Sequence, residues 1–286
     1  MAYDFDQVDV FGGRSFGGNP LAVVHDADGP STAQLQEFAR WTNLSETTFL
    51  LPPTTSEADY RVRIFTGSEE LPFAGHPTLG SCHAWLRRHP DATRDTFVQE
   101  CGVGLVRLRR SFDELVGEQL AFAAPPLINF GPVDPDRLKI IADALGIGLD
   151  RIERAQHIDN GPGWVGIQLT DAEQVLSVSS AGLPCPVGVV GPCPPGGPYE
   201  VEVRGFFPSG GSVFEDPVTG SLNAALAQWL VPLGVLPNSY RAHQGTQVGA
   251  DGVITIEQTD GTIWVGGRCA TKISGTVDLG DPRADR

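Results

Sequence analysis

The amino-acid sequence repeats itself at an offset of 140 residues, close to half of its 286 residues. At this offset residues 76–86 fall on residues 216–226, with Pro, Gly, Ser, Ala and Leu at shared positions. The same offset places residues 31–35 on residues 171–175, and both segments predict a helix start with the same kind of capping residue. Because Gly, Ala and Leu are abundant here, one match alone could be accidental. Two matches at one offset favour a chain built from two similar halves.

The charge balance limits the partners of such a chain. There are 35 Asp and Glu against 20 Lys and Arg, and the net charge of −15 predicts no nucleic-acid partner, because phosphates would be repelled. No basic segment precedes an apolar run at the start, and no stretch reaches the ~20 apolar residues of a membrane helix. We therefore expect a cytoplasmic protein with no membrane partner. Five scattered cysteines without a CxxC pair indicate reduced thiols and no structural metal.

Each repeated segment predicts a turn that leads into a helix, with Pro near the first turn and Gly-Ser behind it. The exposed amides of such a helix start attract anions and can hold a carboxylate. His76 and Asp216 are expected at equivalent positions just before the two helices, where they could move protons in a shared cleft. The alternative is that Asp216 is only a helix cap and His76 a turn residue. The repeat leaves both interpretations open.

Two further polar residues carry no decisive signal in the pattern alone. Glu46 stands where a predicted strand begins, and its residue type at that place favours a solvated strand-start carboxylate. Asn19 lies in a Gly-Gly-Asn-Pro turn, where its side chain could bind either its own backbone or a ligand. Motifs for nucleotide binding, zinc peptidases and α/β-hydrolases do not occur in the sequence.

Several segments together resemble the PhzF family of phenazine-biosynthesis-like isomerases, within the diaminopimelate-epimerase-like superfamily. They occur in family order and span nearly the whole chain. The matching segments are FGGNPLAVV (16–24), NLSETTFLL (43–51), RIFTGSEELPFAGHPTLGS (63–81), VFEDPVTGSLNAAL (213–226) and VGGRCATKISGTVDL (265–279). The SETTF and AGHP elements are closer to the phenazine-pathway isomerases than to relatives with a CGHA-type variant.

The resemblance implies an α+β fold of two pseudo-symmetric domains, each with a curved, mostly antiparallel sheet around a central helix. The active site would lie in the cleft between them. Residues 1–125 would form the first domain, with the segment from about 275 to 286 returning to it, and residues 126–274 would form the second. The resemblance also implies a homodimer that uses no cofactor and no metal.

The resemblance assigns roles to individual residues. The glutamate of SETTF, here Glu46, is implied to be the catalytic acid and base, which overturns the pattern-based interpretation of this residue. His76 and Asp216 are implied to assist proton delivery. The residues implied to bind the small carboxylated substrate are Asn19, Gly75, Gly220 and Ser221. In the phenazine enzyme the glutamate takes a proton beside the hydroxyl of a trans-2,3-dihydro-3-hydroxyanthranilate and returns it across the diene, and the resulting enol becomes a ketone.

Two alternatives remain beside this isomerase. An amino-acid racemase or epimerase of the same fold would use paired thiols near Ala74 and Asp216, where the sequence has none, although Cys82 keeps a thiol close by. A non-catalytic relative would keep the cleft only to bind a ligand. The sequence also departs from the family pattern at Gly67, which replaces a usual Pro, and near Ala250, where an Arg is missing. The true substrate and its pathway therefore stay open.

Overall fold

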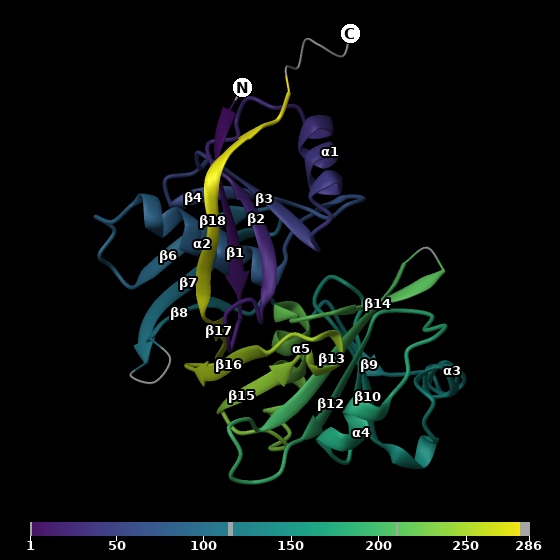
Figure 1. Ribbon diagram of the computed structural model, residues 1–286. Coiled ribbons are helices and arrows are strands. Elements are labelled where there is room, and N and C mark those ends of the chain that lie inside the picture. The colour runs from purple at the N-terminus through teal and green to yellow at the C-terminus, as the bar shows by residue number, and fades with distance from the viewer. Residues whose placement is uncertain (1, 114–116, 210, 281–286) are drawn as a thin grey trace. The chain divides into compact units, whose positions relative to one another are not determined.

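The computed structural model describes residues 2–113, 117–209 and 211–280, and its chain divides into two compact units (Figure 1). The first unit comprises residues 1–123 and 266–286, and the second comprises residues 124–265. The chain thus returns to the first unit at Gly266, earlier than the expected position near residue 275. No helix of the described residues is long and apolar enough to cross a membrane.

The first unit is a mixed sheet in which most neighbours run antiparallel. Its strands follow one another in the order β18, β1, β2, β3, β4, β6, β7 and β8, and among these neighbours, as far as the structure describes them, the β2–β3 and β4–β6 pairs are parallel. The short β5 pairs with β4. The strands are β1 (Ala2–Val10), β2 (Asn19–Val24), β3 (Glu46–Leu51), β4 (Tyr60–Phe65), β5 (Glu70–Leu71), β6 (Thr96–Cys101), β7 (Gly104–Asp113), β8 (Gly117–Ala123) and β18 (Cys269–Asp278).

Two helices complete the part of the first unit that the structure describes. Helix α1 (Thr32–Thr42) begins with the predicted capping box between Ser31 and Gln34, and it buries Leu35 and Ala39. Helix α2 (Gly75–Arg88) is the central helix, since it contacts β1, β2, β3, β8 and β18. Its first eight residues are all buried, which explains their small size and low charge.

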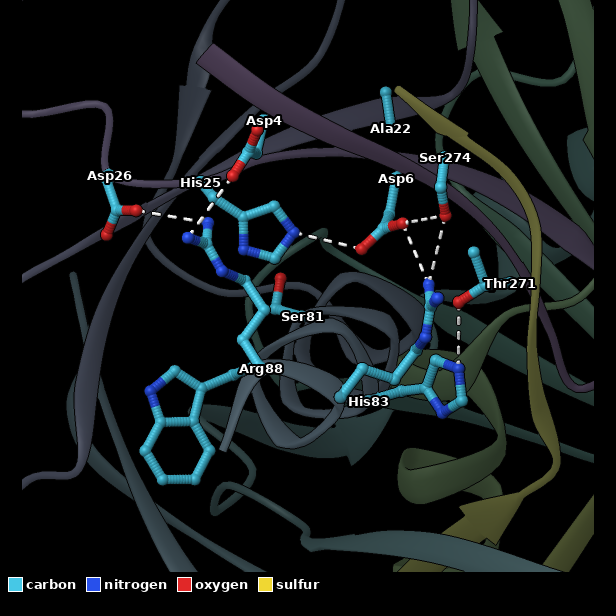
Figure 2. Close-up of polar contacts among 12 residues, drawn as sticks. Asp4, Asp6, Ala22, His25, Asp26, Ser81, His83, Arg88, Thr271 and Ser274 are labelled. Carbon is cyan, nitrogen blue, oxygen red and sulfur yellow. Dashed lines mark hydrogen bonds and ion pairs between the residues drawn. The ribbon is translucent and has the colours of Figure 1, made fainter. Parts of the chain in front are cut away.

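The returning strand β18 is fastened to this unit by polar side chains (Figure 2). The carboxylate of Asp6 on β1 accepts hydrogen bonds from Arg87 Nη1 at 2.9 Å and from Ser274 Oγ at 2.5 Å, and its other oxygen lies 3.0 Å from His25 Nε2. One helical turn earlier, His83 Nε2 lies 3.1 Å from Thr271 Oγ1. These contacts join β1, α2 and β18, segments far apart in the sequence.

The second unit repeats the same plan. Its strand order is β9, β10, β11, β12, β13, β15 and β16, with β11–β12 and β13–β15 as the parallel pairs and β14 beside β13. The strands are β9 (Asn129–Pro132), β10 (Ile152–Asp159), β11 (Val165–Leu169), β12 (Val187–Pro192), β13 (Val201–Ser209), β14 (Ser212–Asp216), β15 (Ser239–Gln244), β16 (Gly252–Thr259) and β17 (Thr262–Gly267). The helices are α3 (Pro135–Leu145), α4 (Ala172–Ser177) and α5 (Gly220–Leu230), with 3₁₀ turns at Leu149–Arg151 and Thr246–Val248.

The two units therefore carry the duplication that the sequence repeat predicts. Helices α1 and α4 occupy the same place in the strand order, between the two members of the first parallel pair, and α2 and α5 are the long helices that follow β5 and β14. Helix α5 is buried along almost its whole length, as the interior part of α2 is. The α+β class follows from this plan, because each sheet is covered by helices drawn from the same stretch of chain.

The predicted equivalence of His76 and Asp216 is wrong. Helices α2 and α5 open at Gly75 and Gly220, which are 145 residues apart, so the offset of 140 does not hold at this point. His76 is the second residue of α2, whereas Asp216 ends β14 and precedes α5. The cause is the place of the proline: Pro77 lies within the first turn of α2, where a missing N–H costs nothing, while Pro217 stays outside α5.

Candidate active site

In the first unit, a carboxylate and an imidazole meet at the start of α2. Glu46 opens β3, opposite Leu21 of the parallel neighbour β2, and His76 is in the first turn of α2. His76 Nε2 lies 3.4 Å from Glu46 Oε2. The side chain of His76 is 5% exposed and that of Glu46 is 17% exposed. Glu46 is therefore not the solvated strand-start residue that its pattern alone favours.

The imidazole of His76 is neutral at physiological pH. Burial lowers its pKa to about 3, because the charged ring would lose its hydration. The contact with Glu46 is thus a polar contact to a neutral ring and not an ion pair. Nε2 of His76 and Oε2 of Glu46 are close to each other but do not meet hydrogen-bond geometry. A carboxylate next to a neutral imidazole can take up and release one proton while the imidazole orients the reacting group.

Buried hydroxyls behind Glu46 hold β3 against α2. Ser81 Oγ on α2 donates to Thr48 Oγ1 at 2.9 Å, and Thr48 Oγ1 donates to the carbonyl of Ala22 on β2 at 3.4 Å. Both hydroxyls are fully buried. This chain of hydrogen bonds fixes the register between the strand that carries Glu46 and the helix that carries His76.

Two more predicted residues lie in the same unit. Asn19 opens β2, pairs with Val10 of β1 and has no exposed surface. Gly75 opens α2 and is buried, and the residue before it, Ala74, is the N-cap. Because an alanine side chain cannot accept a hydrogen bond, the first amides of α2 depend on other acceptors, and a ligand carboxylate is one such acceptor.

In the second unit, Asp216 lies in a network of hydrogen bonds before α5. Thr219 is the N-cap of α5, so Asp216 is not the helix cap that one sequence interpretation made it. Thr219 Oγ1 donates to Asp216 Oδ2 at 2.6 Å. The amide of Gln244 donates to the carbonyl oxygen of Asp216 at 3.0 Å and to Thr219 Oγ1 at 2.8 Å. Its oxygen accepts from Thr219 N at 3.1 Å and from Asn223 Nδ2 at 3.0 Å.

Ser221 is held at the start of α5 by two side chains. Trp164 Nε1 donates to Ser221 Oγ at 3.2 Å, and Asn160 Nδ2 donates to the carbonyl oxygen of Ser221 at 2.8 Å. Because the indole can only donate, the hydroxyl of Ser221 accepts there and keeps its own proton for another acceptor. Gly220, the residue before it, is the first residue of α5 and is buried.

Sequence reasoning missed three of these supporting residues: Asn160, Trp164 and Gln244. A signal existed for the first two, because the Asp-Asn-Gly-Pro-Gly-Trp segment (159–164) is a Gly/Pro turn before β11, similar to the Gly-Gly-Asn-Pro segment whose Asn and Pro open β2. Gln244 gave no signal, since a buried glutamine at the end of a strand has no pattern of its own. Its role follows only from the parallel pairing of β15 with β13.

The thiol of Cys82, on the same helix as His76, is unsuited to act as a base. Burial raises the pKa of Cys82 to about 12, and the residue lies in the interior of α2. Within the residues that the structure describes, no three His, Cys, Asp or Glu side chains gather as metal ligands do. The structure thus brings Glu46 and His76 together in one unit, and Asp216, Gly220 and Ser221 at one helix start in the other. That both groups serve one substrate stays a prediction.

Comparison with known proteins identifies the class. The model of the PhzC-PhzF family, described as phenazine biosynthesis-like protein, matches residues 8–276. The chain is 35% identical to Antisense-enhancing sequence 1 of Schizosaccharomyces pombe, over 96% of this chain and 98% of that protein. It is 34% identical to trans-2,3-dihydro-3-hydroxyanthranilate isomerase of Pseudomonas fluorescens, over 85% of each. The structure of the PhzF-family phenazine biosynthesis protein of Bacillus anthracis superimposes with a TM-score of 0.79, covering 97% and 99% of the two chains at 19% identity.

These matches place the chain in the epimerase-like fold class and, within it, in one family. The α+β fold is that of PhzF proteins and proline epimerases, as predicted. The chain belongs to the phenazine biosynthesis-like, or PhzF, family, and it is an isomerase. The family resemblance that the sequence motifs indicate is thereby confirmed.

Proposed function

We propose that the chain catalyses a cofactor-free proton shift on a small carboxylated cyclic substrate of the trans-2,3-dihydro-3-hydroxyanthranilate type. The observation that carries the proposal is the contact between Glu46 and the neutral His76 at the start of α2. The identity to the Pseudomonas fluorescens isomerase, over 85% of both chains, supports this class of substrate.

Glu46 is the acid and base of the proposed reaction. Its carboxylate takes the proton from the carbon that bears the hydroxyl group, and the electron pair moves through the conjugated diene. The protonated Glu46 then returns the same proton to the far end of the diene, and the enol that forms becomes a ketone. Substrate and product contain the same atoms, so no oxidant, reductant or second reactant is required. The neutral ring of His76 assists this proton transfer by a hydrogen bond that orients the reacting group of the substrate.

The residues at the start of α5, Asp216, Gly220 and Ser221, bind the substrate and assist the proton transfer. The substrate carboxylate accepts hydrogen bonds from the amides that open α5, at Gly220 and Ser221, and from the Ser221 hydroxyl. The amide at Gly75 and the side chain of Asn19 are further substrate contacts. Asp216 supports proton delivery, and the buried amide of Gln244 holds it in place.

The decisive experiment follows the reaction by NMR in heavy water. Glu46→Gln keeps the shape but cannot accept a proton, so turnover should fall by ~10²–10⁴ or more while substrate binding stays nearly intact. Glu57→Gln, an exposed glutamate of the same unit, is the matched control and should keep full activity. Because one carboxylate removes and returns the proton, the product of the parent should carry little deuterium at the receiving carbon.

Three results would contradict the proposal. Full turnover by Glu46→Gln would remove the glutamate from the reaction. Deuterium entering the α-carbon of amino acids would favour the racemase instead. Tight carboxylate binding without any turnover by the parent would favour a protein that only binds a ligand.

We also propose that the chain forms a homodimer, as the family resemblance implies. Light scattering coupled to gel filtration should then give twice the chain mass of 30.5 kDa. A mass of one chain across the concentration range used for the kinetic assays would show that the monomer is the active species.

A further inference from the structure

A polar cavity lies in the first unit, outside the residues assigned to the reaction. It has a volume of about 250 Å³ and opens between the loop that joins β1 to β2 and the beginning of β18. Its lining is rich in cations although the chain carries a net charge of −15. The lining residues are Asp9, Gly12, Arg14, Ser15, Arg268, Ala270 and Lys272.

The one carboxylate in the lining, that of Asp9, already accepts hydrogen bonds from backbone amides of the protein. Asp9 Oδ2 accepts a hydrogen bond from the amide of Phe16 at 2.7 Å, and Oδ1 accepts from the amide of Gly18 at 2.8 Å. Lys272 Nζ lies 3.8 Å from Oδ2. With Asp9 only 7% exposed, its charge is balanced by two amides and one ammonium group. Asp9 therefore shapes the loop, and the lining as a whole carries three cationic side chains against this one carboxylate.

Two guanidinium groups line the cavity from different segments. Arg14 stands in the loop and Arg268 immediately before β18, and both residues are exposed. In the ranges that the structure describes, no carboxylate lies within ion-pair distance of Arg268. Lys272 adds a third cation, with Nζ 2.8 Å from Ser15 Oγ and 5.1 Å from the centre of the Phe16 ring.

The loop is formed before any ligand arrives. Phe16 has a left-handed backbone with φ of 61°, which a bulky residue adopts only when its surroundings impose it. A Cβ atom at Gly18 would collide with the carbonyl oxygen of Val10 and would lie 2.6 Å from Asp9 Oδ1, so this position accepts only glycine. A preformed loop lowers the entropic cost of binding, since its side chains are already close to their bound places.

We propose that this cavity binds the oxyanion group of a small molecule, a carboxylate or a phosphate, through Arg14, Arg268 and Lys272. Guanidinium groups match the two oxygens of such a group in a fork, and an ammonium group adds a point charge. The volume suits one acidic group with a few attached atoms. A neutral molecule would gain none of these charged contacts.

Calorimetric titration at low ionic strength tests the site with inorganic phosphate, with benzoate and with neutral benzamide. The parent should bind at least one of the two anions and not benzamide, and the anion that binds identifies the ligand as phosphate or carboxylate. The double variant Arg14→Gln/Arg268→Gln should weaken that binding by ~10-fold or more, since two charged hydrogen-bond partners are lost. Arg137→Gln/Arg151→Gln removes two exposed arginines of the second unit and should leave the affinity within about twofold of the parent. Circular dichroism establishes that both variants are folded.

Three outcomes would overturn the inference: no binding of either anion by the parent, equal affinity of parent and double variant, or benzoate binding that Ser221→Ala abolishes and Arg14→Gln/Arg268→Gln leaves intact. The last result would assign the bound carboxylate to the candidate active site. None of these measurements uses turnover, so a failure of the proposed isomerase function would leave the test of this cavity valid.

Discussion

The side-chain amide of Gln244 bridges Asp216 and the start of α5: it donates to the carbonyl oxygen of Asp216 at 3.0 Å and accepts from the amide of Thr219 at 3.1 Å. Gln244 is fully buried, so each of these groups has lost its contact with water. A buried residue at the end of β15 thus helps to hold the backbone of Asp216 in place before α5.

Replacing Gln244 should reduce both stability and catalysis. Gln244→Ala leaves the amide of Thr219 and the Asn223 side chain without this acceptor, which should lower the free energy of unfolding by about 2–4 kcal/mol. The turnover number should fall more than KM rises, because Asp216 is no longer held by the hydrogen bond from Gln244 while the proposed substrate contacts remain. Urea unfolding and steady-state kinetics measure the two effects. Gln247→Ala, an exposed glutamine nearby, should change the unfolding free energy by less than about 0.5 kcal/mol.

The pH dependence of catalysis should not report His76. Because burial lowers its pKa to about 3, the ring stays neutral from pH 5 to 8. His76→Gln should therefore lower kcat/KM by about 10–100-fold at every pH in this range without changing the shape of the profile. If a limb near pH 6.5 in the parent disappears in His76→Gln, the ring titrates during turnover and this prediction is wrong.

The indole of Trp164 should contribute to substrate binding through Ser221. Trp164→Phe keeps an aromatic ring but removes the donor to Ser221 Oγ, so the hydroxyl is less well oriented. Affinity for 3-hydroxyanthranilate should fall about 3–10-fold, the value of one ordinary hydrogen bond. Combining Trp164→Phe with Ser221→Ala should add little to Ser221→Ala alone. Trp41→Phe, on a side chain that is 79% exposed, is the control and should bind as the parent does.

Stability should decrease as the pH falls below 6.5, partly because of His83. Burial lowers the pKa of His83 to about 4, so between pH 6.5 and 4 the unfolded chain takes up a proton that the folded chain refuses. Above pH 6.5 the ring is neutral in both states, and His83 does not reduce the free energy of unfolding. As the pH falls from 6.5 towards 4, this free energy decreases. His83→Gln should reduce the slope of unfolding free energy against pH by up to about 1.4 kcal/mol per pH unit.

Thr271→Val separates this titration from the loss of a contact. The variant removes the hydroxyl that lies 3.1 Å from His83 Nε2 but keeps the imidazole, so it should lower stability while the slope against pH remains. Unfolding by urea at several pH values measures both. An equal slope in the parent and His83→Gln would show that His83 titrates alike in the folded and unfolded chains.

The comparison of sequence and structure is clearest at the two central helices. The repeat of Pro, Gly, Ser, Ala and Leu predicted the duplication, because a duplicated half must bury the same helix against the same strands. It also placed His76 opposite Asp216, and the structure does not. A sequence repeat aligns residues by their number along the chain. The first residue of a helix depends instead on whether the proline lies inside the first turn, as Pro77 does in α2, or before it, as Pro217 does at α5.

The environment of Glu46 was also not predictable from the local sequence pattern. Its position at a strand start indicated a solvated carboxylate, and only the SETTF resemblance indicated otherwise. The structure leaves it only partly exposed beside His76, because a parallel pairing of β2 with β3 and a hydroxyl chain through Ser81 bring β3 against α2. Burial of this kind arises from contacts between segments about thirty residues apart, which no local pattern contains.

The sequence by itself determined the duplication, through its repeat, and the family, through the motifs that carry the resemblance. The α+β plan followed from that resemblance. Only the tertiary structure decided the protonation of His76, the support of Asp216 by Gln244 and the return of the chain at Gly266. Each of these depends on the removal of water or on hydrogen bonds between distant segments, and both exist only once the chain has folded.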